Sequence, residues 1–219
     1  MTLTELRKNI ASWFARMGQR LLNEPEPSIF LLLVIAMMTM GASLAEGVLV
    51  TYFSHAGENY NVGVIEEGNT AKLAKVIAEQ TGTELFEIVP VVDYPQSYDE
   101  CLEVATAEQR EGARPEYMGD VENWDQYDTI FIGYPIWWGE IPNIVYTFME
   151  AYDFTGKTVI PFNTHEGSGQ AHSQRDIEGL LTSASVLKGL AVRGSKAQND
   201  ADGTGTDVAN WLKSIGLTQ

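Results

Sequence analysis

The residues from Ser54 to Thr70 include several whose types suit phosphate binding. Ser54 and His55 open this stretch, and Gly68-Asn69-Thr70 closes it directly before a helical pattern. Glycine permits a tight turn, and the free N–H groups at a helix start bind phosphate without lysine or arginine. A plain helix N-cap after a long loop explains the same residues. Three nearby carboxylates oppose a bound anion unless they face outward: Glu58, Glu66 and Glu67.

A second stretch places two adjacent tryptophans between prolines, after an uncharged strand pattern. Its residues are Pro135, Ile136, Trp137, Trp138 and Gly139. A solvated turn does not require two indoles, whereas a flat aromatic ligand stacks well on an indole ring. Burial of both indoles in the core is the alternative interpretation.

A third stretch combines small and hydroxyl-bearing residues, in the order Thr164, His165, Glu166, Gly167, Ser168 and Gly169. Glycines and hydroxyls let backbone N–H groups approach the polar edge of a ligand closely. A flexible turn fits the same residues.

The histidines and the single cysteine carry weaker signals. His55, His165 and His172 titrate near neutrality and could transfer protons, although contact with backbone or water explains them equally. Their spacing predicts no metal site. Cys101 lies in a predicted helix over residues 95–111, and we expect it to pack there, away from the three stretches.

Strand and helix patterns alternate along the chain from residue 48 onward. The helices are predicted over residues 69–80, 95–111, 141–152, 177–184 and 206–215, and the strands over residues 48–53, 85–89, 129–133, 158–163 and 186–193. This alternation predicts an α/β fold, a doubly wound parallel sheet with helices on both faces. Ligands of such sheets bind beyond the carboxyl ends of the strands, where the three stretches should meet.

Several motifs in this order resemble the flavodoxin family, in particular a bacterial flavodoxin-like group with an extended first loop. They are YFSHAGENYNVG, EEGNT, AKLAKVIAEQTG, DYPQSYDE, ARPEY, YDTIFIGYPIWWGEIP, TFMEAYDFTGKTVIPF and THEGSG, within residues 48–193. The resemblance implies a five-stranded sheet of order 2-1-3-4-5 and non-covalently bound FMN. It implies that Ser54, His55, Gly68, Asn69 and Thr70 take the phosphate. By the same resemblance, Pro135, Ile136, Trp137, Trp138 and Gly139 flank the isoalloxazine, and Thr164, His165, Glu166, Gly167 and Ser168 border its other edge.

The expected function is redox transfer of electrons or hydride between a reduced donor and an acceptor. Either a flavodoxin-type electron carrier or an NAD(P)H-dependent FMN oxidoreductase fits, with basic redox proteins or NAD(P)H as partners. Glu140 and Glu166 would lower the flavin potential by like-charge repulsion, unless they are solvated surface carboxylates. A cofactor-free protein-interaction module on the same scaffold is the alternative. A hydrolase is less favoured, since no Gly-x-Ser-x-Gly nucleophile elbow with a base is recognisable.

The charge balance narrows the range of partners. The 219 residues include 14 Lys and Arg against 30 Asp and Glu, a formal net charge of −16. Nucleic-acid binding requires clustered basic residues, so a nucleic-acid partner is not expected. An acidic surface suits docking to basic proteins.

Residues 1–46 form a separate extension before the flavodoxin-like domain expected at residues 47–219. An amphipathic helical pattern over residues 3–22 precedes an apolar, signal-like run that starts at Ile29. We expect export or membrane association, with any membrane contact made through residues 1–45. The alternative is a misassigned start and a cytoplasmic protein.

Overall fold

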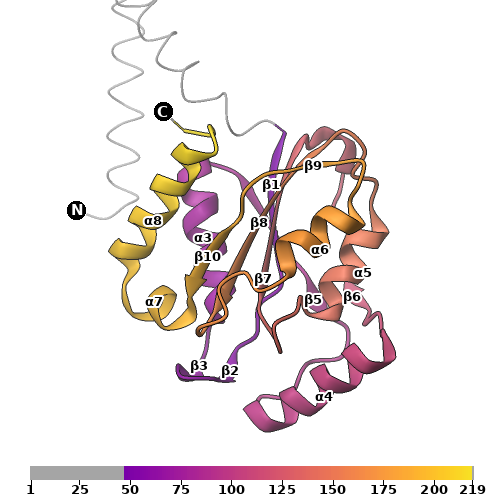
Figure 1. Ribbon diagram of the computed structural model, residues 1–219, viewed down its shortest axis with the longest axis vertical. Helices are drawn as coiled ribbons and strands as arrows, with labels where there is room; N and C mark the ends of the chain where they lie inside the picture. The colour runs from indigo at the N-terminus through magenta and orange to yellow at the C-terminus, as the bar shows by residue number, and fades with distance from the viewer. Residues whose placement is uncertain (1–46, 219) are drawn as a thin grey trace, which may run out of the picture. The chain divides into compact units, whose positions relative to one another are not determined.

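A parallel sheet organises residues 47–218, the part of the chain that the computed structural model describes (Figure 1). Its strand order is β4-β1-β7-β8-β10, and the short β9 also pairs with β8. Counted along the chain, the five ordered strands read 2-1-3-4-5, which confirms the predicted fold. The strands are β1 (Val48–Tyr52), β4 (Glu84–Glu87), β7 (Thr129–Pro135), β8 (Thr158–His165), β9 (Ser185–Val186) and β10 (Leu190–Arg193).

Both faces of the sheet are covered, which explains the uncharged central strands. In β1, Val50 lies in register with Leu85 of β4 and Phe131 of β7, and its side chain is fully buried. Helices on two faces bury such strands completely, so their sequences read as continuous apolar runs.

Two layers of helices enclose the sheet, one on each side in Figure 1. One layer contains α3 (Asn69–Thr81), α7 (Gly194–Asn199) and α8 (Ala201–Ser214). Its core includes Leu73, Val208 and Phe162. The other contains α5 (Asn143–Ala151) and α6 (Ser173–Leu180), whose Phe148 and Ile177 pack with the residues of the second core.

The remaining elements lie outside these layers. The stretch after β1 forms a hairpin of β2 (Gly57–Asn59) and β3 (Gly63–Ile65). Helix α4 (Tyr98–Glu111) packs against α5 and β2, at the end of the molecule where the hairpin lies (Figure 1). A second small ladder pairs β5 (Val89–Pro90) with β6 (Tyr117–Met118), and a short 3-10 helix, η1, spans Trp124–Gln126.

Three predicted elements differ most from the structure. Helix α6 begins and ends four residues before the predicted range. The predicted strand over residues 186–193 is split into β9 and β10 near Gly189, whose backbone lies close to Pro161. The last helix begins at Ala201 because the Asp200 carboxylate accepts a hydrogen bond from the Gly203 amide, an N-cap that apolar periodicity does not reveal.

The predicted amphipathic helix and apolar segment within residues 1–46 lie outside the described residues. Within residues 47–218, the helices are all too short or too polar to cross a membrane.

Candidate functional site

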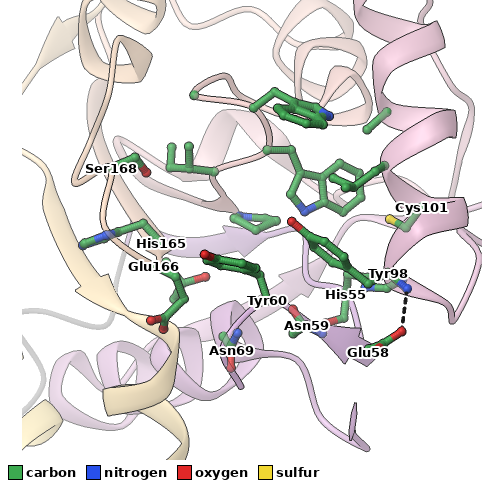
Figure 2. A pocket seen from close by; sticks show the side chains of 18 residues that line it. His55, Glu58, Asn59, Tyr60, Asn69, Tyr98, Cys101, His165, Glu166 and Ser168 are labelled. Carbon is green, nitrogen blue, oxygen red and sulfur yellow. Dashed lines mark hydrogen bonds between the residues drawn. The ribbon is translucent and has the colours of Figure 1, made fainter. Parts of the chain in front are cut away.

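A cavity of about 240 Å³ opens at the carboxyl ends of β1, β7 and β8 (Figure 2). Eleven of the fifteen predicted site residues line it. They are His55, Asn69, Pro135, Ile136, Trp137, Trp138, Gly139, Thr164, His165, Glu166 and Ser168. The fold therefore brings the three stretches together, as expected for a doubly wound sheet.

The other four residues, Ser54, Gly68, Thr70 and Gly167, are not among those that line the cavity. The first three hold the start of α3 in place. The Ser54 hydroxyl accepts a hydrogen bond from the Ala71 amide at 3.0 Å. A side chain on Gly68 would collide with Ser54 and the His55 carbonyl, so glycine is required there. The buried Thr70 hydroxyl bonds that of Thr164 at 2.8 Å, which joins the first loop to the third.

Asn69 carries an unusual buried polar atom. The residue is 9% exposed, its side chain lies against the backbone of Gly194, and its Oδ1 atom has no hydrogen-bond partner within the described chain. A buried acceptor without a donor destabilises the protein by about 1–3 kcal/mol. Because Asn69 lines the cavity, a ligand hydroxyl can supply the donor. A phosphate dianion cannot. In the first turn of α3 the Ala71 and Lys72 amides already bond the Ser54 hydroxyl and the Gly68 carbonyl, so the amides left for a phosphate are those of Asn69 and Thr70.

The two tryptophans have different environments. Trp137 is partly buried, with edge contacts at centroid distances of 5.4 Å to Phe53 and 5.0 Å to Tyr94. Trp138 is 61% exposed and has a φ of 54°, a left-handed conformation that is costly for a bulky residue. Two backbone hydrogen bonds between Trp137 and Glu140 close this turn. Packing against the core thus explains the position of Trp137 in part, but it does not explain the exposed position of Trp138.

Both loop histidines contact the backbone. His165 Nδ1 accepts hydrogen bonds from the Gly167 and Gly169 amides at 2.9 and 3.1 Å, so the proton of the neutral ring lies on Nε2. The pKa of His165 is lowered by burial and by the nearby Arg193. His55 Nε2 lies 2.9 Å from the Pro95 carbonyl, and burial lowers its pKa as well. Lowered pKa values favour two neutral imidazoles at this site.

The two carboxylates expected near the ligand are held differently. Glu166 Oε1 accepts a hydrogen bond from the Ser195 amide at 2.6 Å, and Oε2 lies 3.8 Å from the Arg193 guanidinium. The side chain of Glu166 is only 11% exposed. Glu140 lies in the tryptophan turn, where its backbone closes the hydrogen-bond pair with Trp137. The charge of Glu166 is thus compensated by groups of the protein.

One wall of the cavity was not predicted from the sequence. It is formed by the β2–β3 hairpin and by α4, which contribute Glu58, Asn59, Tyr60, Tyr98, Cys101, Leu102 and Ala105. The expectation that Cys101 lies away from the three stretches was wrong, because α4 packs against the hairpin beside the cavity. The available signal was the helical spacing of Tyr98, Cys101, Leu102 and Ala105, which places them on one face.

No metal centre is evident in this region: within residues 47–218, no cluster of three or more His, Cys, Asp or Glu side chains could hold an ion.

The comparisons with known proteins agree with this geometry. Candidate flavoproteins of Bacteroides eggerthii and Bacteroides uniformis are each 28% identical to the chain, with TM-scores of 0.63 and 0.58. The alignments cover 78% and 77% of this chain, and 98% and 99% of the two structures. A Lactobacillus acidophilus flavoprotein, solved in complex with FMN, is 23% identical over 70% of this chain and 97% of its own, with a TM-score of 0.55, and shares the fold.

No curated protein sequence matches the chain. A flavodoxin family model, in contrast, matches residues 47–215, which include the whole sheet and every residue that lines the cavity. On the strength of that match, the chain belongs to the flavodoxin family.

Proposed function

We propose that this protein binds FMN non-covalently in the cavity and transfers electrons or hydride between a reduced donor and an acceptor. The observation that carries the proposal is the meeting of eleven predicted ligand residues around one cavity at the carboxyl edge of the sheet. Membership of the flavodoxin family supports the same ligand. FMN in the related Lactobacillus acidophilus structure, which has the same fold, is consistent with it.

The residues present fit the parts of FMN. The Asn69 and Thr70 amides at the start of α3 would hold the phosphate, and Asn69 Oδ1 would accept a hydrogen bond from a ribityl hydroxyl. The Trp138 indole would cover the flat ring. His165 would donate from Nε2 to an acceptor on the polar edge of the ring.

Bound FMN supplies the reversible uptake of electrons, and the protein sets its position and surroundings. The neutral forms of His55 and His165 place no positive charge beside the ring. Trp137, packed edge-on against Phe53 and Tyr94, would present an apolar surface to the ring. These features favour a ring held by stacking and neutral hydrogen bonds.

The charge around the cavity favours a protein partner. Among the described residues, the charged lining side chains are Glu58 and Glu166, and no lysine or arginine lines the cavity. A nicotinamide dinucleotide carries a negatively charged diphosphate, which an acidic protein surface repels. The net charge of −16 and the lack of lysine or arginine in the lining favour docking of a basic redox protein.

The test is an absorption spectrum of the full-length protein after incubation with FMN and desalting. We expect retained flavin bands with quenched fluorescence. Trp138→Ala should weaken retention, while Trp124→Ala, which removes an indole far from the cavity lining, should leave it unchanged in the folded protein. Equal retention of FMN by both variants would show that Trp138 does not contribute to FMN binding. A colourless wild-type protein would contradict FMN binding and favour the cofactor-free interaction module.

A separate assay distinguishes the two redox roles. The FMN-loaded protein is mixed with NADH or NADPH, and nicotinamide absorbance is followed. We expect no steady consumption above that of free FMN, because the acidic surface repels the anionic dinucleotide. Rapid consumption would identify an NAD(P)H-dependent oxidoreductase and contradict the preference for a carrier.

A further inference from the structure

The two ends of the cavity differ in chemistry. The end formed by the β8 loop presents hydroxyl and imidazole groups, those of Thr164, His165 and Ser168. The opposite end is formed by α4, with Cys101, Leu102 and Ala105. Figure 2 shows His165, Glu166 and Ser168 on one side and Tyr98 and Cys101 on the other, with Tyr60 between them. One end is therefore polar and the other apolar.

Apart from the Glu58 carboxylate at its edge, which bonds the Tyr98 amide, the α4 end is uncharged as well as apolar. Burial raises the pKa of the Cys101 thiol to about 11, so the side chain is a neutral thiol at physiological pH. Burial also raises the pKa of the Tyr98 phenol. Ala105 is 3% exposed and presents only a methyl group. A ligand that lies against this wall gains from burying apolar surface, whereas a polar atom there would lose its hydrogen bonds to water.

Both edges of the α4 wall are fastened to the cavity loops. The Glu58 carboxylate accepts a hydrogen bond from the Tyr98 amide at 3.0 Å, and the Glu58 amide donates to the Gln96 carbonyl at 2.8 Å. Farther along the helix, the Gln109 side-chain amide donates to the Trp137 carbonyl at 3.1 Å. These bonds hold α4 at a defined distance from the tryptophan turn, so the space beside the wall is preformed.

The isoalloxazine ring of a flavin has matching ends. Its pyrimidine end carries carbonyl and N–H groups, and its dimethylbenzene end carries two methyl groups on an apolar ring. We propose that α4 encloses the dimethylbenzene end, and that Leu102 and Ala105 limit the space beyond the methyl group at position 8, so that flavins with a larger group there are rejected. This inference rests on the proposed binding of FMN. The cavity volume of about 240 Å³ suits one such ring system.

The arrangement also assigns the route by which partners reach the ring. With the dimethylbenzene end enclosed, the exposed aromatic side chains at the cavity are Trp138, at 61%, and Tyr60, at 57%. A redox partner then approaches over Trp138 and Tyr60, and the ring edge beside α4 takes no part in the contact.

The test compares FMN with its 8-dimethylamino analogue by competition, with recovery of FMN fluorescence as the measure of displacement. We expect the wild-type protein to bind the analogue at least about tenfold more weakly, since a larger group in a well-filled site forces unfavourable contacts. Leu102→Ala should reduce the difference in affinity between the two flavins, because the smaller side chain leaves space for the larger group at position 8. Val104→Ala, at a residue of the same helix that does not line the cavity, should leave it unchanged.

A second measurement needs no variant. Thiophenolate displaces chloride from position 8 of 8-chloro-FMN, which forms a carbon–sulfur bond and changes the absorption spectrum. We expect this reaction to be many-fold slower for the bound flavin than for the free one. The inference would be overturned, although FMN binding would stand, by any of three results. These are equal reaction rates for bound and free 8-chloro-FMN, equal affinities of the wild-type protein for FMN and its 8-dimethylamino analogue, or no effect of Leu102→Ala on the difference in affinity. A failure of FMN itself to bind would refute the proposed function and the inference together.

Discussion

Two regions of this molecule are rich in aromatic side chains, at opposite edges of the sheet. At the amino edge, the Trp124 cluster comprises Trp124, Phe148, Tyr152 and Phe154. Trp124 stacks on Tyr152 at a centroid distance of 4.4 Å, and its indole N–H donates to the Asp153 carbonyl at 2.8 Å. The buried Lys157 ammonium donates to the Tyr127 carbonyl. The polar groups of this region thus have partners.

The cavity at the carboxyl edge differs in two respects. The Asn69 carboxamide oxygen has no partner in the described chain, and Trp138 is exposed in a left-handed conformation. Both features cost stability in the protein alone. The comparison teaches that aromatic content does not distinguish a stabilising cluster from a binding site. An unpartnered buried polar atom and a bulky residue in a left-handed conformation do indicate a binding site, because a ligand can offset their cost.

The largest expected effect is on the Trp124 cluster. Phe148 is fully buried and contacts four aromatic rings, those of Phe86, Tyr117, Trp124 and Tyr152. Phe148→Ala should lower the free energy of unfolding by about 3–5 kcal/mol, because it leaves a cavity in a packed core. Denaturant unfolding measures the change. FMN affinity of the folded protein should not fall, and a loss of both would show that the two regions are coupled.

The second prediction concerns Asn69. Asn69→Ala removes the orphaned oxygen and should weaken FMN binding by about tenfold, while the stability of the flavin-free protein stays unchanged or rises. Asn143 is the matched control, because its side-chain amide donates to the Glu108 and Ala113 carbonyls. Asn143→Ala should destabilise the flavin-free protein by about 1–3 kcal/mol. Equal destabilisation by both variants would show that Asn69 is a structural residue.

The third prediction separates strain from stacking at Trp138. Asparagine tolerates the left-handed conformation, so Trp138→Asn should stabilise the flavin-free protein by about 0.5–1 kcal/mol. Trp138→Ala retains most of the strain and should not stabilise it. Thermal unfolding of both variants is compared with their FMN affinities, and we expect FMN to bind more weakly to each. Tighter binding by either variant would contradict a stacking role.

The fourth prediction concerns pH. The pKa values of His55 and His165 are lowered from 6.5 in the folded protein, so the unfolded chain takes up protons first as the pH falls. Stability should be fully present above pH 6.5 and decline below it. Replacing both residues, as His55→Gln and His165→Asn, should flatten this decline in denaturant titrations. Replacement of the exposed His172 by Gln is the control, and an equal flattening there would contradict the assignment.

The smallest expected effect is on the flavin potential. Glu140→Gln and Glu166→Gln should each raise the potential of bound FMN, since Glu166 lines the cavity and Glu140 lies in the tryptophan turn that borders it. The increase in potential should be smaller for Glu166→Gln, because the Glu166 charge is compensated by the Ser195 amide and by Arg193. Interactions of this kind are worth up to about 1 kcal/mol, or about 20 mV for two electrons. Redox titration of both variants measures the two increases in potential. A larger increase for Glu166→Gln would indicate that the Glu166 charge acts on the ring without compensation by the Ser195 amide and Arg193.

The sequence by itself determined the fold class and most of the cavity lining, and its resemblance to the flavodoxin family supplied the strand order. Largely apolar, uncharged runs identified the central strands, because strands covered on both faces carry few polar residues. The motifs around Gly68, Trp137 and Gly167 lie at strand ends, and parallel strands place such ends at one edge of the sheet. Local pattern and topology therefore sufficed for these residues.

Only the tertiary structure decided the second wall of the cavity and the roles of individual side chains. The packing of α4 against the hairpin depends on the contact between Glu58 and Tyr98, residues 40 positions apart, which no local pattern reveals. The orphaned oxygen of Asn69 and the exposure of Trp138 likewise depend on neighbours from distant segments, such as Gly194. The physical reason is that local propensity selects helices and strands, whereas burial, partners and strain arise only when distant segments meet.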